Sequence, residues 1–270
     1  MRFVIVIPSF NQADFLPITV NSILSQDADV VLRIVDGGST DSTLSYLRSI
    51  DDRRVVWTSE PDGGQSHAIN RGMRWAIEHG ADVLAWLNSD DFYLPKALAT
   101  VGEALAAHTE ASWVVGDCRI ADVNGGRIRE TIRRYKRYRL VRYTYAALLR
   151  ECFLSQPAVF WRIDLERSVA YDGGRLLDES LHYAMDYDLW LRMGRLANPL
   201  IVDQQLAAFR VHGGSKTHTN HRAQFEEQYA VVQRYTEDLG VLRDQRRLIR
   251  RAMLGYRVLH CLGRRVGIGG

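Results

Sequence analysis

The stretch Val83-Leu84-Ala85-Trp86-Leu87-Asn88-Ser89-Asp90-Asp91 decides how the rest of the chain is arranged. Residues 83–87 form a short apolar run, which predicts a buried strand that delivers Asp90 and Asp91 at its carboxyl end. Ligands of open α/β sheets gather at that end. Two neighbouring carboxylates repel each other, and either a divalent cation or a solvated turn relieves the repulsion. The alternative to a metal site is a plain turn before a helix that starts near Pro95. The stretch alone leaves both open.

Composition predicts a globular protein without a membrane-spanning segment. The chain has 270 residues, of which 46% are hydrophobic, enough for one large α/β domain. Its 35 basic and 32 acidic residues give a net charge of +3, too small to indicate a nucleic-acid partner. Cys118, Cys152 and Cys261 are too scattered for a disulfide framework or a zinc site. No signal-peptide pattern follows Met1, and no apolar run approaches the roughly 18 residues of a spanning helix, so we expect a cytoplasmic protein.

Strands and helices alternate along the first half of the chain. Expected strands cover residues 3–7, 30–35 and 55–57, and each is followed by a polar turn and then by a helical pattern. This order predicts a doubly wound, mainly parallel central sheet with helices on both faces. Further strands are expected at residues 113–116, 158–161, 200–202 and 206–210, with a turn at Asn124-Gly125. A helix is expected to open with the acids between residues 178 and 188.

The strand pattern stops near residue 215, so we expect a domain of residues 1–215 and a helical extension of residues 216–270. The extension is helical by period from about residue 221 to 264, with a weak break at Gly240. One side carries Leu242, Ile249, Met253 and Tyr256, and the other carries Arg243, Arg246, Arg250 and Arg257. Such a helix can pack on the sheet domain, form a homodimer or lie on an anionic membrane surface at the inner face of the membrane.

A second basic segment covers residues 127–150. It holds nine Lys or Arg residues against the single acid Glu130, with four tyrosines interleaved. A charge run of this kind is often only a solvated surface. The other interpretation is a flap that binds the acceptor or a phosphate.

Four blocks of the sequence together resemble the family 2 glycosyltransferases, inverting enzymes of the GT-A fold that use nucleotide sugars. The blocks are Val4-Ile5-Val6-Ile7-Pro8-Ser9-Phe10-Asn11, Ile34-Val35-Asp36-Gly37-Gly38-Ser39-Thr40-Asp41, Asn88-Ser89-Asp90-Asp91 and Met185-Asp186-Tyr187-Asp188-Leu189-Trp190-Leu191-Arg192. The resemblance covers residues 3–215 and implies that Asp36 lies near the nucleotide base, with Pro8, Phe10, Asn11 and Gly37 around the donor. It also implies that Asp90 and Asp91 are the DxD-like pair and that Asp186 is the catalytic base.

The sequence departs from the family pattern at three places. Many members have a second acid at the position of Gly37, and that position affects which nucleotide base is recognised, and so whether the donor carries uridine. Met185 replaces the usual acid before the catalytic aspartate, and Asn88 opens the metal motif in place of an aspartate.

The chemistry of sugar transfer needs the same groups. Cleavage of a sugar–diphosphate bond develops charge on the leaving phosphates, which Mn²⁺ or Mg²⁺ neutralises. We expect Asp91 to anchor that cation, with Asp90 closer to the sugar. The attacking hydroxyl must lose a proton, so Asp186 is the expected general base, and a helix cap is its alternative role. A single in-line displacement inverts the anomeric carbon.

Further donor contacts are expected from two other polar turns. One turn, at a strand-to-helix junction, contains Asp62, Gln65 and Asn70, and it suits a diphosphate or sugar hydroxyls. The alternative is an ordinary turn. We also expect a donor contact from Asn88 of the metal motif. His212 follows a strand in a glycine-rich turn, where it can bind the metal or a phosphate, or is merely solvated.

The predicted function is transfer of a sugar from a UDP-sugar to a hydroxyl of a saccharide or lipid-linked saccharide, in polysaccharide, O-antigen or glycolipid synthesis. One alternative is a nucleotidyltransferase, which usually needs a glycine-rich loop after the first strand, and residues 8–12 are not one. The other alternative is a catalytically silent module that binds a nucleotide or sugar.

Overall fold

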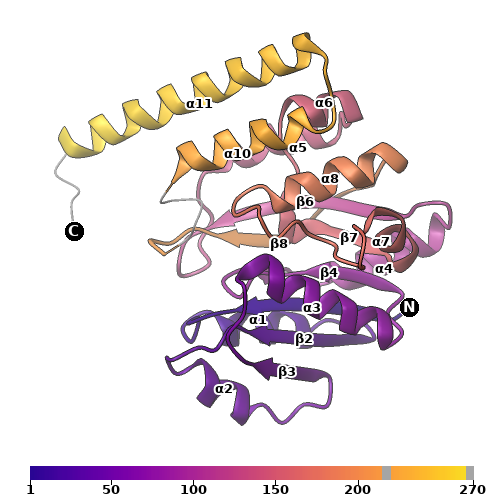
Figure 1. Ribbon diagram of the computed structural model, residues 1–270. Coiled ribbons are helices and arrows are strands. Elements are labelled where there is room, and N and C mark those ends of the chain that lie inside the picture. The colour runs from indigo at the N-terminus through magenta and orange to yellow at the C-terminus, as the bar shows by residue number, and fades with distance from the viewer. Residues whose placement is uncertain (215–219, 266–270) are drawn as a thin grey trace.

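The computed structural model describes the backbone of residues 1–214 and 220–265 and the side chains up to residue 253. It contains an eight-stranded mixed sheet in the order β3-β2-β1-β4-β7-β6-β8-β5, flanked by helices (Figure 1). The strands are β1 Phe3–Ser9, β2 Val30–Asp36, β3 Val55–Ser59, β4 Val83–Trp86, β5 Phe92–Tyr93, β6 Trp113–Ala121, β7 Val159–Arg162 and β8 Leu200–Arg210. The helices are α1 Leu16–Leu24, α2 Thr43–Ser49, α3 Gln65–Glu78, α4 Ala97–Ala107, α5 Glu130–Leu140, α6 Tyr145–Arg150, the 3₁₀ turn η1 Gln156–Ala158, α7 Ile163–Val169, α8 Met185–Leu196, α10 His221–Gln233 and α11 Leu239–Arg265.

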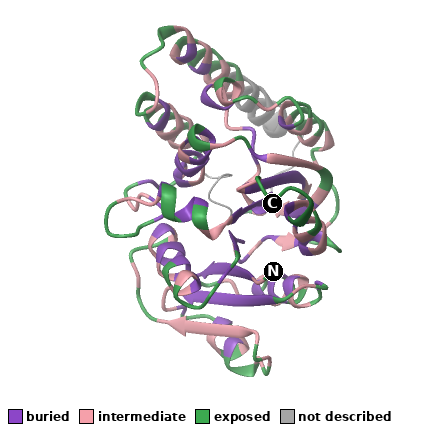
Figure 2. Cartoon of the chain, turned by 90° about the vertical axis from the view of Figure 1, so that its right-hand side faces the viewer, coloured by how far each residue is buried: buried purple, intermediate pink, exposed green. Residues whose placement is uncertain are grey.

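The four strands β3, β2, β1 and β4 are parallel, which confirms the expected α/β class. Every residue of β1 and β2 is buried, as their continuous apolar runs predict (Figure 2). The second strand in sequence, β2, lies on one side of β1, and β4 lies on the other. The strand order thus reverses at β1, and the loops after β1 and β4 diverge at the carboxyl edge. Ligand sites of open α/β sheets form at such a point.

The other half of the sheet is mixed. β7 pairs antiparallel with β4 and β6, whereas β8 runs parallel to β6 and antiparallel to β5. The two strands expected at residues 200–202 and 206–210 are one strand, β8, whose register shifts opposite Gly116 to Cys118. Gly116 allows this close approach, because a Cβ there would lie 2.5 Å from the Leu206 side chain.

Four buried tryptophans join α8 to the sheet. The ring of Trp190 on α8 stacks on Trp86 of β4 with centroids 5.5 Å apart and on Trp113 of β6 at 6.3 Å. Trp161 of β7 meets Trp86 and Trp190 edge-on. These large side chains fix the position of α8 and hence the direction of its amino end.

Two helical predictions were wrong in their bounds. The acids at residues 178–181 belong to a loop, and α8 begins only at Met185. Asp178 accepts hydrogen bonds from the backbone and the hydroxyl of Ser180, a local turn that competes with helix formation. The long carboxyl-terminal helix is a hairpin of α10 and α11, and the break precedes Gly240, where Asp238 accepts the Gly240 N–H at 2.7 Å.

The proposed division near residue 215 falls on residues 215–219, outside the described part of the chain, as do the side chains of Tyr256 and Arg257. None of the described helices is both long enough and apolar enough to cross a bilayer.

Candidate functional site

The loops after β1 and β2 are joined to each other. The backbone N–H of Asn11 donates to Ser39 Oγ at 2.7 Å, and Asn11 Oδ1 accepts the Thr40 N–H at 2.8 Å. Asn11 has a φ of 53°, a conformation that asparagine tolerates better than most residues. These bonds hold the first two motif blocks together at the carboxyl edge of the sheet.

Asp36 shapes the second of these loops from within. It is fully buried, and its carboxylate accepts hydrogen bonds from the backbone of Gly38 and Ser39 and from the hydroxyls of Ser39 and Ser59. Its two oxygens are therefore already used by the protein. Phe10 differs, because 58% of its surface is exposed beside this loop, while Pro8 is buried in β1.

The carboxylate of Asp62 lies beside Gly37. A Cβ at Gly37 would lie 3.1 Å from Asp62 Oδ1, so the Asp62 carboxylate occupies the space beside Gly37. Asp62 Oδ1 also accepts the Gly64 N–H at 2.7 Å, which fixes the turn that starts α3. The loop after β3 thereby supplies a carboxylate to the loop after β2.

Three amide side chains connect α3 with the end of β4. Gln65 Nε2 donates to Asn88 Oδ1 at 2.8 Å, and Asn88 Nδ2 lies 3.4 Å from both Asp91 Oδ2 and Gln156 Oε1. Gln156 Nε2 donates in turn to the Trp86 carbonyl at 2.7 Å. Gln156 was not among the residues predicted from the sequence, although the polar turn before the buried strand β7 was a signal.

The two adjacent aspartates lie in different environments. Asp91 is fully buried, its Oδ1 accepts the backbone N–H of Arg210 at 2.8 Å, and its carbonyl accepts Thr19 Oγ1 at 2.6 Å. Burial, and next the charge of Asp90, raise the pKa of Asp91 well above its usual value. The side chain of Asp90 is 20% exposed, and its Oδ2 lies 2.9 Å from Nε2 of His212.

Arg210 supplies positive charge behind this pair. Arg210 is 1% exposed, and its guanidinium carbon lies over the rings of Phe15 and Phe92, at 4.9 and 5.1 Å from their centroids. Its charge opposes the rise in the pKa of Asp91. Arg210 was not among the residues predicted from the sequence, although a cation at the end of an apolar strand is a signal.

His212 opens onto a hollow of about 410 Å³. The hollow is lined by residues 11–15, Asp41, Ser42, His212 and Gly214. The Gly214 N–H donates to Nδ1 of His212 at 3.2 Å, which leaves Nε2 facing Asp90 Oδ2 at 2.9 Å. The ring of Phe15 lies 4.5 Å from the imidazole.

A carboxylate and an imidazole side by side fit Mn²⁺ or Mg²⁺, whose remaining ligands can be phosphate oxygens and water. Among the side chains of residues 1–214 and 220–253, no cluster of three or more His, Cys, Asp or Glu residues adds to this pair. A cation here would depend on ligands from the substrate.

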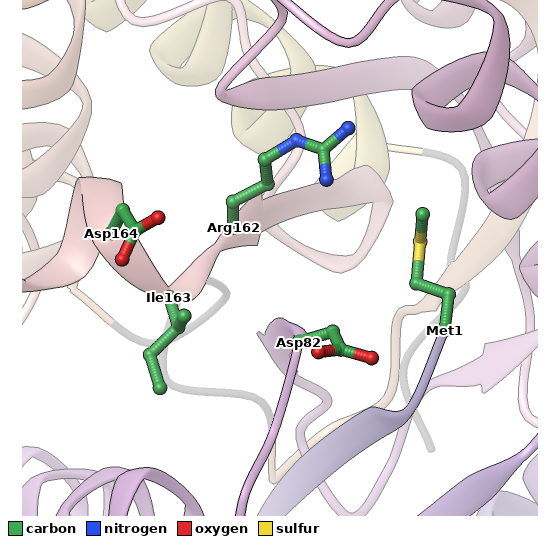
Figure 3. A pocket seen from close by; sticks show the side chains of 5 residues that line it. All are labelled: Met1, Asp82, Arg162, Ile163 and Asp164. Atoms are coloured by element: carbon green, nitrogen blue, oxygen red, sulfur yellow. The ribbon is translucent and has the colours of Figure 1, made fainter.

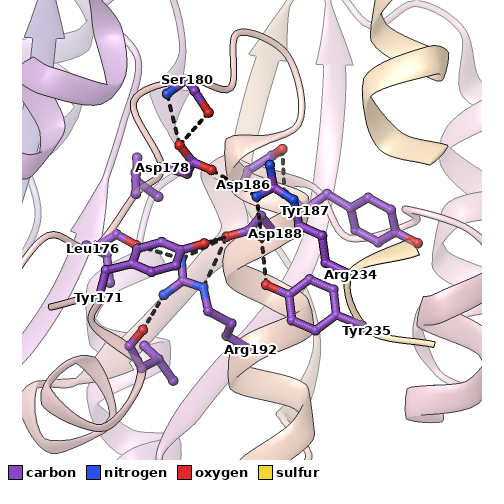
Figure 4. Close-up of polar contacts among 12 residues, drawn as sticks. Tyr171, Leu176, Asp178, Ser180, Asp186, Tyr187, Asp188, Arg192, Arg234 and Tyr235 are labelled. Carbon is purple, nitrogen blue, oxygen red and sulfur yellow. Dashed lines mark hydrogen bonds and ion pairs between the residues drawn. The ribbon is translucent and has the colours of Figure 1, made fainter. Parts of the chain in front are cut away.

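Asp186 lies at the amino end of α8 (Figure 4). It is half-buried, and its Oδ1 accepts the N–H of Tyr187 at 2.7 Å. Burial raises the pKa of Asp186 to about 6, Glu227 adds to the rise, and Lys136 opposes it. A carboxylate with this pKa is ionised at neutral pH yet basic enough to accept a proton.

Asp188, two residues further on, has a structural role. It is fully buried and accepts hydrogen bonds from the hydroxyls of Tyr171 and Tyr235, each at 2.7 Å, and from Arg192 at 3.1 Å (Figure 4). Because it is fully buried and holds three donors of the protein itself, this carboxylate is out of reach of a substrate hydroxyl. It holds α8 to the segments on either side.

Asn70 is also used by the protein itself. It is 2% exposed, donates to the Leu177 carbonyl at 3.0 Å and to Glu179 Oε1 at 2.9 Å, and accepts the Leu177 N–H at 2.8 Å. These bonds position the loop before α8. Its expected contact with the donor stays a prediction.

Comparison with known proteins gives the family. The family model for glycosyl transferase family 2 matches residues 4–162, more than half of the chain. The chain belongs to glycosyl transferase family 2. An uncharacterized glycosyltransferase of Mycobacterium tuberculosis is 34% identical over 122 residues, 43% of this chain and 45% of the relative. By that match the chain spans about half the length of the relative.

Other relatives agree with the family. The undecaprenyl-phosphate mannosyltransferase of Micrococcus luteus is 25% identical over 79% of this chain and 89% of its own length. S. aureus TarS, solved with UDP-GlcNAc, matches 90% of this chain and 69% of its own at a TM-score of 0.65 and 17% identity. A mannosyltransferase from Pyrobaculum calidifontis, solved with GDP-Man and Mn²⁺, matches 90% of this chain and 68% of its own at a TM-score of 0.67 and 17% identity. These two structures confirm the GT-A-like fold.

A second hollow lies at the opposite edge of the sheet, away from the family 2 motif blocks. That hollow, of about 360 Å³, lies at the amino ends of β1 and β4 and is lined by Met1, Asp82, Arg162, Ile163 and Asp164 (Figure 3). The Arg162 guanidinium donates to the carbonyls of Ala111 and Leu105, which gives it a structural role. The family 2 motif blocks all lie at the carboxyl edge instead.

Proposed function

We propose that the chain is an inverting glycosyltransferase that moves a sugar from a UDP-sugar to an acceptor hydroxyl. The observation that carries the proposal is Asp186, a half-buried carboxylate at the start of a helix that four tryptophans hold against the sheet. Its pKa of about 6 suits a general base. The family and the nucleotide-sugar ligands named for two solved relatives support the same reaction.

In this proposal Asp90 and His212 would hold the cation, and Mn²⁺ or Mg²⁺ would neutralise the charge that develops on the leaving diphosphate. The sequence pointed to Asp91 as the anchor. Asp91 Oδ1 is bound to the Arg210 N–H and its side chain has no exposed surface, so we assign it to support of the loop. Asp90 is the member of the pair that faces His212.

The nucleotide is proposed to lie against Phe10 and the joined loops of Asn11 and residues 37–41. Asp62 Oδ1 already accepts the Gly64 N–H, which leaves Oδ2 as one acceptor beside Gly37. One acceptor suits the single ring N–H of uracil better than the two adjacent donors of guanine. Gln65 and Asn88, bonded to each other at 2.8 Å, then lie toward the diphosphate and sugar.

The acceptor is proposed to be a saccharide or lipid-linked saccharide that approaches from the side of α5 and α8. Asp186 takes the hydroxyl proton as the oxygen attacks the anomeric carbon, and the leaving diphosphate departs on the opposite face, so the configuration inverts. The basic helix α11 is proposed to hold the protein at an anionic membrane surface, or to join two copies. The name of the Micrococcus luteus relative includes a lipid phosphate, which supports a lipid-linked acceptor.

The competing candidate is a binding module without activity, since a nucleotide pocket alone would explain the motif loops. A panel of UDP- and GDP-sugars with Mn²⁺, followed by thermal shift and by release of the nucleoside diphosphate, distinguishes the two. An enzyme shows binding and turnover, and turnover disappears in Asp186→Asn. Binding without release of nucleotide under any donor and acceptor would support the silent module.

A further inference from the structure

The side chain of Glu227 reaches from α10 to the segment that leads into α8. Its carboxylate accepts three backbone N–H groups, from His182 at 2.7 Å, from Tyr183, and from Ala184 at 2.8 Å. Glu227 is half-buried on the inner side of α10, whereas its neighbour Glu226 is exposed and pairs with Arg222. One carboxylate thus binds three consecutive amides of a segment more than forty residues away in sequence.

This contact places an anion just before the start of α8, which has no capping side chain of its own. Its N-cap residue is Ala184, which has no side chain able to accept a hydrogen bond. Helix starts expose N–H groups and a partial positive charge, and an anion placed there is stabilising. Glu227 provides the anion from another helix.

The two residues that follow α10 contact α8 and the loop before it. Tyr235 donates to Asp188 Oδ1 at 2.7 Å, and Arg234 donates to Asp178 at 2.9 Å (Figure 4). Two points of contact therefore flank Asp186: Glu227 holds residues 182–184 before it, and Tyr235 holds Asp188 after it. The start of α8 cannot shift without breaking one of them.

We propose that Glu227 is a positioning residue for the transfer reaction, fixing residues 182–184 so that the Asp186 carboxylate stays directed at the acceptor hydroxyl. This inference rests on the proposed role of Asp186 as the base. It makes α10 part of the catalytic unit, although the sequence pattern places it in a separate extension. Misplacement of a catalytic group by about 1 Å can cost about 100-fold in rate.

The charges around Asp186 give the proposal a second signature. Glu227 on α10 and Lys136 on α5 face it with opposite effects, Cys152 after α6 lies within electrostatic reach, and the Tyr187 N–H of its own helix stabilises the anion. Loss of the Glu227 charge lowers the pKa of Asp186. Loss of the Lys136 charge raises it.

The test compares Glu227→Gln with Glu226→Gln, the same change one position along on the exposed side. We expect Glu227→Gln to lower kcat by about 10- to 100-fold, with KM for the donor little changed. In the pH profile of kcat/KM, the acid limb of Glu227→Gln should move to lower pH. The acid limb of Lys136→Gln should move to higher pH. Glu226→Gln should behave as the wild type.

Hydrogen exchange provides a readout that does not need activity. Amides of residues 182–184 should exchange about 10-fold faster or more in Glu227→Gln than in Glu226→Gln, because their acceptor is weakened. If Glu227→Gln does not fold, Glu227→Asp keeps the charge but shortens the reach, and it should lose rate with an unmoved acid limb. Equal rates, pH profiles and exchange in the variants of Glu226 and Glu227 would overturn the proposal. If instead Asp186→Asn transfers sugar normally, the proposed base fails, whatever the exchange data show.

Discussion

Replacement of Asp186 by asparagine separates a catalytic base from a helix cap, because the two roles predict opposite changes in stability. Asparagine keeps the size of the side chain, and its Oδ1 can still accept the Tyr187 N–H that Asp186 accepts at 2.7 Å. It cannot accept the hydroxyl proton. We expect kcat to fall about 100- to 10,000-fold while the donor affinity is kept.

The stability effect follows from the pKa of Asp186, which burial raises from 3.8 to about 6. An acid whose pKa is higher in the folded state makes its stabilising contribution below pH 3.8 and loses it as the pH rises through about 6. The ionised form therefore costs stability at neutral pH, by at most about 3 kcal/mol at 1.36 kcal/mol per pKa unit. Asp186→Asn should raise the Tm at pH 8 and leave it nearly unchanged at pH 4.

An aspartate that only stabilises the amino end of α8 through its charge would behave in the opposite way, because loss of that charge costs about 0.3 to 1 kcal/mol. The assay is a pair of measurements on one preparation: transfer rates from pH 5 to 9 and thermal unfolding at pH 4 and 8. The wild type should lose activity about tenfold per pH unit below pH 6, where the base becomes protonated. Near-normal transfer by Asp186→Asn together with a lower Tm would refute the reasoning and leave Glu179 as the remaining acid.

Three further predictions concern the metal, the basic helix α5 and the membrane. Asp90→Asn should abolish the Mn²⁺-dependent thermal shift given by a nucleoside diphosphate, whereas Asp91→Asn should retain part of it. A larger loss of the shift in Asp91→Asn than in Asp90→Asn would identify Asp91 as the metal ligand. Lys136→Gln should raise KM for an anionic acceptor several-fold, and Arg134→Gln, on the exposed side of α5, is its control. Equal acceptor kinetics in the two variants would contradict an acceptor-binding role for residues 127–150. Flotation with anionic liposomes should show salt-sensitive binding that weakens in Arg250→Gln, and its absence would favour packing or a dimer.

The parallel half of the sheet was predictable because its strands are buried on both faces. In sequence, such strands are unbroken apolar runs that end in polar turns. The runs at residues 3–7 and 30–35 therefore predicted β1 and β2 almost to their ends. Strand β8 was harder. Asp203 and the two glutamines after it break its apolar pattern at an exposed stretch, and the bulge opposite Gly116 realigns the remainder.

The carboxylates of the site could be located by sequence but not sorted by environment. Asp36, Asp91 and Asp188 all belong to motif blocks, and all three are fully buried with their oxygens bound to donors of the protein itself. Asp90 and Asp186 retain access to the outside. What distinguishes the two groups is the position of partners such as Arg210 or Tyr235, more than forty residues away in sequence, which no local pattern encodes.

The adjacent carboxylates of Asp90 and Asp91 have different partners, and only that of Asp90 is partly exposed. Asp91 binds the Arg210 N–H, which ties the loop after β4 to the end of β8 two residues before His212. That bond sets the distance between the loop and His212, and Asp90 can then meet the imidazole at 2.9 Å. The buried charge is expensive, as the raised pKa of Asp91 shows, and the guanidinium of Arg210 offsets part of the cost. A strict DxD spacing would place one residue between the two acids, whereas here the fully buried carboxylate of Asp91 and the partly exposed carboxylate of Asp90 are neighbours.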